Sequence, residues 1–274
     1  FILYFAGPNE ELPVVEGLGF DFSGNYLLES SEKMDTLTYW LKDSMLYRND
    51  TLKLSVKYKV PDSLGIMVDR IDTLSLVPKK KWAKVVEQQQ KIFEEEKKKF
   101  LRQESRKEGY DKDNPPLFIP KTKVLPVKFS GNSTMDVNGD CRFVFEEPLE
   151  CADSSALHVF HMVDSTLVPM EFVFRRSDRS INEYELFAEW RPGQKYKLEV
   201  DSAAFKGIYG GVSESLTRDM QFRTLEEYAV LYLNIPGVGN NGIVQLLSSD
   251  KIVMQERTKD NRCAFYFIKP GKYF

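Results

Sequence analysis

The chain has 274 residues, of which 42% are hydrophobic and 29% charged, and its 38 basic and 41 acidic side chains give a net charge of −3. These values are typical of a soluble globular protein of about two domains. They argue against a dedicated nucleic-acid-binding protein, which would carry a basic surplus. No apolar run reaches the roughly 18 residues of a membrane-spanning helix.

The two ends of the sequence suggest a piece of a longer protein. The chain begins at Phe1 without an initiator methionine or a signal peptide. Only three residues follow the turn sequence Pro270-Gly271, which normally leads into another strand. We therefore expect any targeting signal to lie upstream of Phe1.

The three cysteines are too few to form a disulfide framework. Their odd number permits at most one disulfide, between any two of them. We interpret all three as small buried residues, because free cysteine is among the most often buried residue types. They are Cys141, Cys151 and Cys263.

Residues 1–78 are predicted to form a β-domain. Apolar residues alternate with lysine and serine over 51–60, which is the period of a strand with one buried face. Shorter alternating runs occur at 1–5, 37–41 and 74–76, with turn sequences between them. Several short strands at a spacing of about ten residues favour an Ig-like β-sandwich.

Residues 79–116 are predicted to form a charged helix and a linker. No glycine or proline occurs over 79–108, and glutamate precedes lysine by four residues at several positions. Gly109 is expected at the C′ position that ends the helix. We interpret the thin apolar stripe of this helix as docking on a neighbouring domain, and a partner-binding or dimerising face is the alternative. The stripe consists of Trp82, Val86, Phe93 and Phe100.

The rest of the chain is again predicted to be β-structure. Residues 117–225 contain six or seven alternating segments, the size of a second Ig-like sandwich. Residues 226–274 contain four further strand-like segments, and we interpret them as a truncated third β-domain. The expected fold is therefore mainly β, with tandem Ig-like sandwiches joined by a long charged helix and followed by a partial third domain.

No motif in the sequence indicates catalysis. His158 and His161 have the spacing of a helical metal site, but their surroundings read as a strand, which would point the two rings to opposite faces. The glycine-rich stretch 237–242 lacks the spacing of a phosphate-binding loop. We therefore predict no catalytic residue, no cofactor, no metal site and no enzymatic activity.

Two aromatic residues interrupt the alternation of their strands. Trp40 is out of phase with Tyr39 and Leu41, and Phe187 is out of phase with Leu186. Either ring could stack on a sugar. We favour packing against the helix or a neighbouring domain, because large exposed apolar groups usually mark an interface.

The segment 140–224 resembles the bacterial Ig-like domain family of S-layer proteins, the SbsA-type domain. The resemblance rests on an opening strand with proline at 143–148, a turn followed by a tyrosine-containing strand at 191–200, and a final strand at 220–224. The Asp and Asn of the family's turn are missing at 205–211, which argues against a cation there.

The wider arrangement resembles cell-envelope lipoproteins of Gram-negative gut commensals. In these proteins Ig-like domains alternate with carboxypeptidase-regulatory-like, or prealbumin-type, β-domains, and 242–247 with 265–273 is similar to the start of such a domain. The resemblance implies a lipid anchor upstream and a position at the outer membrane, facing the periplasm or the cell surface.

The resemblance also implies a function without catalysis. The expected role is that of a structural spacer, a scaffold or an adhesion module, with other envelope proteins or surface glycans as partners. A carbohydrate- or peptide-binding module, which would use an exposed aromatic ring or an open strand edge, is the alternative. Accessory domains of a larger enzyme are a further alternative.

Such bacteria O-glycosylate exported proteins at Asp followed by Ser or Thr and a small or apolar residue. The pattern occurs seven times in this chain. Asp-Ser and Asp-Thr are also ordinary turn sequences, so both interpretations stay open. The candidate hydroxyl residues are Thr36, Ser44, Thr51, Ser63, Thr73, Ser165 and Ser202.

Overall fold

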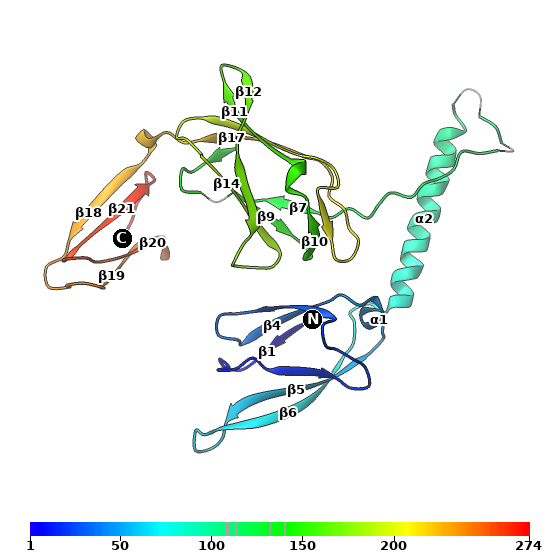
Figure 1. Cartoon of the computed structure of the whole chain (residues 1–274), viewed down its shortest axis with the longest axis horizontal. Coiled ribbons are helices and arrows are strands. Elements are labelled where there is room, and N and C mark those ends of the chain that lie inside the picture. The colour runs from blue at the N-terminus through cyan, green and yellow to red at the C-terminus, as the bar shows by residue number, and fades with distance from the viewer. Residues whose placement is uncertain (108–109, 113, 132, 140) are drawn as a thin grey trace. The chain divides into compact units, whose positions relative to one another are not determined.

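The computed structural model describes residues 1–107, 110–112, 114–131, 133–139 and 141–274 (Figure 1). The chain is mainly β, with 44% strand and 12% helix, which confirms the expected fold class at this level. It divides into two compact units, Phe1–Lys123 with Ile208–Gly211, and Val124–Gly207 with Val212–Phe274. The predicted helix end at Gly109 lies outside the described residues.

Two antiparallel three-stranded sheets form the first unit, in the orders β1-β4-β3 and β2-β5-β6. They share one core, in which Leu37 and Tyr39 of the first sheet pack with Leu54 and Val56 of the second. The strands are β1 (Ile2–Tyr4), β2 (Val14–Gly17), β3 (Tyr26–Ser30), β4 (Thr36–Leu41), β5 (Leu52–Pro61) and β6 (Met67–Leu76).

Strand β5 follows the alternation that predicts it. Leu52, Leu54 and Val56 are buried, while Lys53 and Lys57 are exposed. Burial of one apolar face is the main stabilising contribution of such a strand, because its charged face gains nothing from packing.

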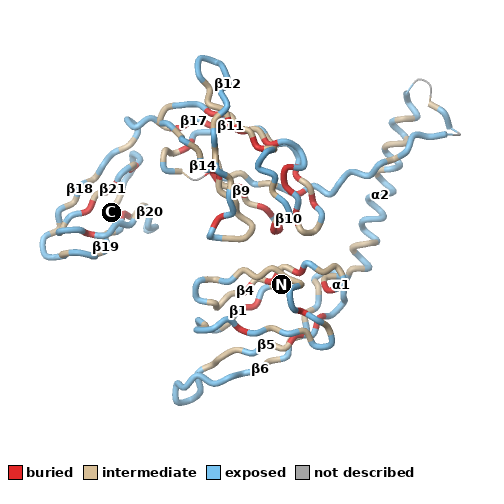
Figure 2. The backbone as a smooth tube through the Cα atoms, viewed as in Figure 1, coloured by how far each residue is buried: buried red, intermediate tan, exposed pale blue. Residues whose placement is uncertain are grey.

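The first unit also contains two helices. The short helix α1 (Ser44–Tyr47) begins at Asp43, whose carboxylate accepts a hydrogen bond from the Met45 amide. Helix α2 (Trp82–Glu104) has 23 residues, and none of them is buried, as Figure 2 shows along its length. It is shorter at both ends than the glycine- and proline-free run 79–108.

The second unit contains a five-stranded sheet in the order β12-β11-β15-β17-β8 and a four-stranded sheet in the order β13-β14-β9-β7. Both sheets contribute to one core around Phe143, Tyr196, Phe205 and Phe222. A short pair, β10 and β16, adds to it. The strands are β7 (Val127–Phe129), β8 (Thr134–Met135), β9 (Cys141–Phe145), β10 (Leu149–Ala152), β11 (Leu157–Val163), β12 (Thr166–Pro169), β13 (Phe172–Arg176), β14 (Glu183–Ala188), β15 (Lys195–Val200), β16 (Phe205–Gly207) and β17 (Leu216–Phe222), with a 3-10 turn at Ser154–Ala156.

Within the described residues this region has eleven strands, so the expectation of six or seven was too low. The additional strands are short: β8 has two residues, and β16 has three. A segment of this length cannot display a two-residue period clearly, which is why alternation fails to reveal it.

The second unit ends with two strand pairs. The pairs are β18 with β21 and β19 with β20, and they enclose a small core around Leu246, Cys263, Phe265 and Ile268. The four strands match the four predicted segments. They are β18 (Ala229–Asn234), β19 (Ile243–Ser248), β20 (Lys251–Arg257) and β21 (Arg262–Ile268), and a 3-10 turn at Leu225–Glu227 precedes them.

Asp136 connects the two parts of the second unit. Its carboxylate pairs with Lys269 Nζ at 2.5 Å, lies 3.4 Å from Arg223 Nε and accepts a hydrogen bond of 3.0 Å from the Tyr228 hydroxyl. Burial acts to raise the pKa of Asp136, but Lys269, Tyr228 and Arg223 together hold it below its ordinary value. The carboxylate is therefore an anion at neutral pH. It links Arg223, which precedes the 3-10 turn at Leu225–Glu227, with Tyr228 and Lys269, which follow it.

None of the three cysteines forms a disulfide, and only two of them are buried as expected. Cys141 and Cys263 are buried, whereas Cys151 is exposed. Cys151 lies on the short strand β10, whose middle residues face solvent. The prediction of three buried cysteines is therefore wrong for Cys151.

Candidate functional site

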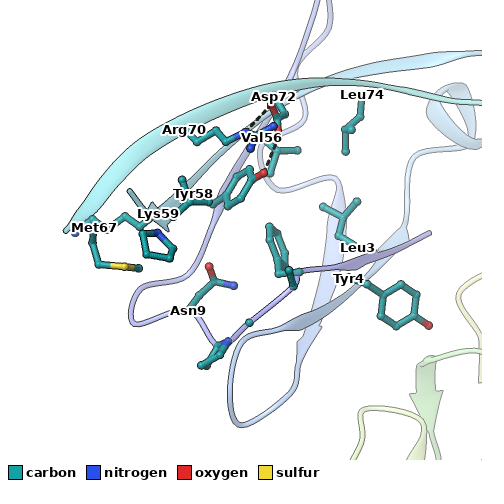
Figure 3. Close-up of a pocket in the computed structure, with 16 residues that line it drawn as sticks. Leu3, Tyr4, Asn9, Val56, Tyr58, Lys59, Met67, Arg70, Asp72 and Leu74 are labelled. Carbon is teal, nitrogen blue, oxygen red and sulfur yellow. Dashed lines mark hydrogen bonds and ion pairs between the residues drawn. The ribbon is translucent and has the colours of Figure 1, made fainter. Parts of the chain in front are cut away.

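A cavity of about 430 Å³ lies in the first unit between the N-terminal segment and the hairpin formed by β5 and β6 (Figure 3). Its volume falls in the range of about 300–1,000 Å³ that ligand sites occupy. The lining comes from residues 3–9 and from strands β5 and β6. Segments far apart in the sequence thus line opposite sides of the cavity. The periodicity of hydrophobic residues does not show that these segments meet.

The floor of the cavity is apolar. Leu3 and Val56 are buried, and Leu74 is half-buried beside them. The ring of Phe5 packs edge-on against Tyr58, with ring centroids 5.2 Å apart. These floor residues also belong to the hydrophobic core of the first unit, and packing within that core fixes their positions.

A polar cluster forms one wall of the cavity. The Tyr58 hydroxyl donates a hydrogen bond of 2.6 Å to Asp72 Oδ2, and Arg70 Nε donates one of 3.2 Å to Asp72 Oδ1. Figure 3 shows both contacts converging on Asp72 beneath the hairpin. Charge-assisted bonds of this kind fix the orientation of all three side chains.

The cluster has a defined protonation state. The hydrogen bond from Tyr58, followed by that from Arg70, holds the pKa of Asp72 below its ordinary value. The same bond is the largest cause of the raised pKa of Tyr58. At neutral pH Asp72 is therefore an anion and Tyr58 a neutral donor, so the wall offers a fixed dipolar surface.

The rim of the cavity combines engaged polar groups with exposed apolar ones. Lys59 Nζ lies 3.3 Å from Glu11, and the Asn9 side-chain amide donates a hydrogen bond of 2.6 Å to the Met34 carbonyl. Met67 is 37% exposed at the mouth, whereas the ring of Tyr4 points away from the cavity (Figure 3). An apolar floor, a few fixed polar groups and an open mouth are typical of a binding site.

Trp40 does not line this cavity. Its neighbours Tyr39 and Leu41 are buried, and Trp40 itself is half-buried on the other face of β4, opposite Leu27 of β3. Its indole Nε1 is shielded from solvent and has no hydrogen-bond partner within the described residues. The ring is therefore a poor platform for a sugar, although the out-of-phase position is as predicted.

Phe187 lies on β14, and it too is outside the cavity. Its side chain is 41% exposed, and the guanidinium of Arg175 lies 4.7 Å from its ring centroid. A sugar that stacked on this ring face would have to displace Arg175.

The apolar stripe of α2 is partly covered by its own unit. The ring of Phe118, in the segment after the helix, lies 5.4 Å from Phe93 and 5.5 Å from Phe100. At the other end Trp82 contacts Tyr47, with centroids 6.2 Å apart. Val86 lies between these contacts and is half-buried. A partner-binding role of the stripe remains a prediction, and Phe93 is still 38% exposed.

The candidate glycosylation residues differ in exposure. Two of the preceding aspartates form local turns: Asp43 caps α1, and Asp62 accepts hydrogen bonds from the amides of Leu64 and Ile66. The turn interpretation therefore holds for these two, and modification at any of the seven remains a prediction. Thr51, Ser63, Thr73, Ser165 and Ser202 are exposed, and Thr36 and Ser44 are half-buried.

His158 and His161 lie on strand β11 and engage different neighbours. His158 Nε2 is 3.2 Å from the Asp201 carboxylate, whereas the His161 ring stacks on Tyr196 with centroids 5.1 Å apart. Tyr196 is buried in the core, so the two rings lie on opposite faces of the strand, as predicted. No group of three or more His, Cys, Asp or Glu in the described part of the chain is placed to hold a metal ion.

Among the described residues, no helix has both the length and the apolar character needed to cross a lipid bilayer. Neither a protein-family model nor a curated protein sequence matches this chain. Membership of a family therefore stays a prediction, based on the sequence resemblances alone.

Proposed function

We propose that this chain is part of a non-enzymatic, modular cell-envelope protein whose β-domains act as a structural spacer, a scaffold or an adhesion module. One observation carries the proposal. The described residues form three separate hydrophobic cores, around Leu54, Phe143 and Phe265. Separate cores are typical of independently folded domains, and a series of such domains can act as a spacer between other parts of a protein.

The proposal includes the way in which the sheets of each unit pack. The two sheets of the first unit and the two large sheets of the second would pack as Ig-like sandwiches, linked by α2. Support comes from the way each core draws side chains from both of its sheets, as inward-facing residues do in a sandwich. The last two strand pairs would be the beginning of a prealbumin-type domain.

The proposed location and the proposed role can be tested on native cells. Intact cells are treated with protease, and the region is followed by immunoblotting, with a cytoplasmic and a periplasmic protein as controls. Cleavage in whole cells places the domains on the surface, and cleavage only after the outer membrane is broken places them in the periplasm. Protection together with the cytoplasmic control contradicts the proposal.

A peptide-binding role is a second candidate, and the cavity of the first unit favours it. The cavity combines an apolar floor with fixed polar groups and lies beside a strand edge. A glycan-binding role at Trp40 or Phe187 has weaker support, since Trp40 is half-buried with its indole Nε1 shielded from solvent, and Arg175 lies over the ring of Phe187.

A further inference from the structure

Strand β1 lies at the edge of its sheet, and among the residues that the structure describes its one partner strand is β4. The N-terminal amine of Phe1 donates to the Tyr39 carbonyl at 3.0 Å, and the Tyr39 amide donates to the Phe1 carbonyl at 2.9 Å. The Phe5 amide donates to the Asp35 carbonyl at 2.8 Å. The chain therefore bonds to β4 from Phe1 to Phe5, beyond the three residues of the strand itself.

The direction of the remaining backbone groups follows from this register. In an antiparallel pair, alternate residues point their N–H and C=O groups to the partner and the others point them away. Since Phe1 and Phe5 bond to β4, the N–H and C=O groups of Ile2 and Tyr4 point to the open edge. No hydrogen bond to them occurs within the described residues.

This edge carries none of the features that usually block pairing with another strand. Natural sheet edges are guarded by charged side chains, proline or a bulge. Residues 1–5 are Phe-Ile-Leu-Tyr-Phe, with no charged side chain and no proline, and the β1–β4 register is regular.

The second strand edge that borders the cavity, that of β6, carries charged side chains. Strand β6 is the edge of the other sheet, and Arg70 and Asp72 lie on the same face of it as the half-buried Leu74. Inward-pointing charges beside an edge are one of the devices that oppose strand addition. Of the two edges that border the cavity, β1 is therefore the one open to pairing.

The cavity lies where the side chains of an added strand would point. Leu3 and Phe5 face inward from β1, and Tyr58 and Leu74 face them from the other sheet. In a strand paired with β1, every second side chain would enter this space, while its backbone would satisfy the free groups of Ile2 and Tyr4. The free backbone groups and the cavity are therefore both satisfied by the same kind of ligand, an extended strand with alternate apolar side chains.

We propose that the β1 edge of the first unit binds an extended segment of another polypeptide, which adds as a fourth strand and places alternate large apolar side chains in the cavity. Main-chain hydrogen bonds to Ile2 and Tyr4 supply affinity, and the cavity selects the sequence. The dipolar wall around Asp72 excludes charged residues of the partner from the inward positions, because they would lose hydration without gaining a free counter-charge.

The proposal is tested with the 274-residue chain and a defined probe. The probe is a fluorescent peptide of about eight residues in which leucine alternates with threonine, with lysines at both ends for solubility. The control peptide has the same sequence but carries N-methyl groups on alternate residues, so that it cannot form the ladder. Fluorescence anisotropy should show saturable binding of the probe and none of the control peptide.

Two substitutions at one position isolate the backbone bond. Tyr4→Pro removes the N–H that points to the open edge and leaves the bonds of Phe1 and Phe5 to β4 in place, which an edge strand tolerates. Tyr4→Ala removes the side chain and keeps the N–H. We expect Tyr4→Pro to weaken binding about tenfold, the effect of one lost hydrogen bond, and Tyr4→Ala to change it about threefold at most.

Hydrogen exchange measured by NMR on the unsubstituted chain gives a second readout, in case Tyr4→Pro does not fold. The probe should slow exchange of the Ile2 and Tyr4 amides, whereas the Phe5 amide is already bonded. Equal binding of both peptides, equal affinity of the two variants, or unchanged exchange at Ile2 and Tyr4 would overturn the proposal. So would sedimentation showing that a second copy of the chain occupies this edge. None of these results depends on where in the cell the protein resides.

Discussion

At the scale of single residues, the cluster around Asp72 shows how the fold sets a protonation state. Tyr58 lies on β5 and Asp72 on β6, and the hairpin brings the hydroxyl within 2.6 Å of the carboxylate. This bond is the largest cause of the low pKa of Asp72 and also of the high pKa of Tyr58. The two shifts agree, since one bond favours the carboxylate and the neutral phenol together.

Tyr58→Phe removes this hydrogen bond and keeps the ring that packs on Phe5. We expect the pKa of Asp72 to rise toward its ordinary value, because Arg70 alone remains as a donor. NMR titration of the Asp72 carboxyl carbon measures the change. Tyr26→Phe, in the same unit and without a hydrogen bond to Asp72, is the matched control, and an unchanged Asp72 titration in Tyr58→Phe would contradict the assignment.

Asp136 should make the junction in the second unit sensitive to acid. Its pKa is lowered in the folded chain, so its contribution to stability is present above the unfolded value of about 3.9 and is lost as pH falls through the lower folded value. We expect residues 225–234 to exchange amide hydrogen faster as pH is lowered below about 4, after correction for intrinsic rates. In Asp136→Asn this pH dependence should disappear, and its persistence would assign the effect to another group.

At the scale of secondary-structure elements, the long regular segments are predictable and the short ones are not. Alternation identifies β5, and the absence of glycine and proline identifies α2. Strand β8 has two residues and pairs parallel with β17, so only tertiary contact defines it. The cavity is equally invisible in the sequence, because residues 3–9 and 56–74 form it together.

The segment after α2 provides a test at this scale. Phe118 contacts both Phe93 and Phe100, whereas its neighbour Leu117 is 83% exposed. We expect Phe118→Ser to release residues 114–120 from the helix and to raise their rate of proteolytic cleavage. Leu117→Ser is the matched control and should leave cleavage unchanged. Equal cleavage of the two variants would show that the aromatic contacts do not hold this segment.

At the scale of the whole molecule, the two compact units are expected to unfold in separate transitions. Leu54 and Phe222 are fully buried in different cores. We expect Leu54→Ala to cost the first unit about 3 kcal/mol and Phe222→Ala to cost the second about 4 kcal/mol. Calorimetry should show two transitions, of which each substitution lowers only one. Lys53→Ala, on the exposed face of β5, should shift neither by more than about 0.5 kcal/mol. A single transition that both core substitutions lower would contradict independent modules.

Helix α2 has a mechanical consequence for a chain that is pulled from its ends. It spans 23 residues without a buried side chain, so only its own turns and the ring contacts of Tyr47 and Phe118 described above resist its stretching. As a helix it is about 35 Å long, and as an extended chain it would reach about 75 Å. Tension should therefore extend this helix before the sheets of either unit separate. The helix would then act as an extensible tether that lengthens under load and reforms when the load is released.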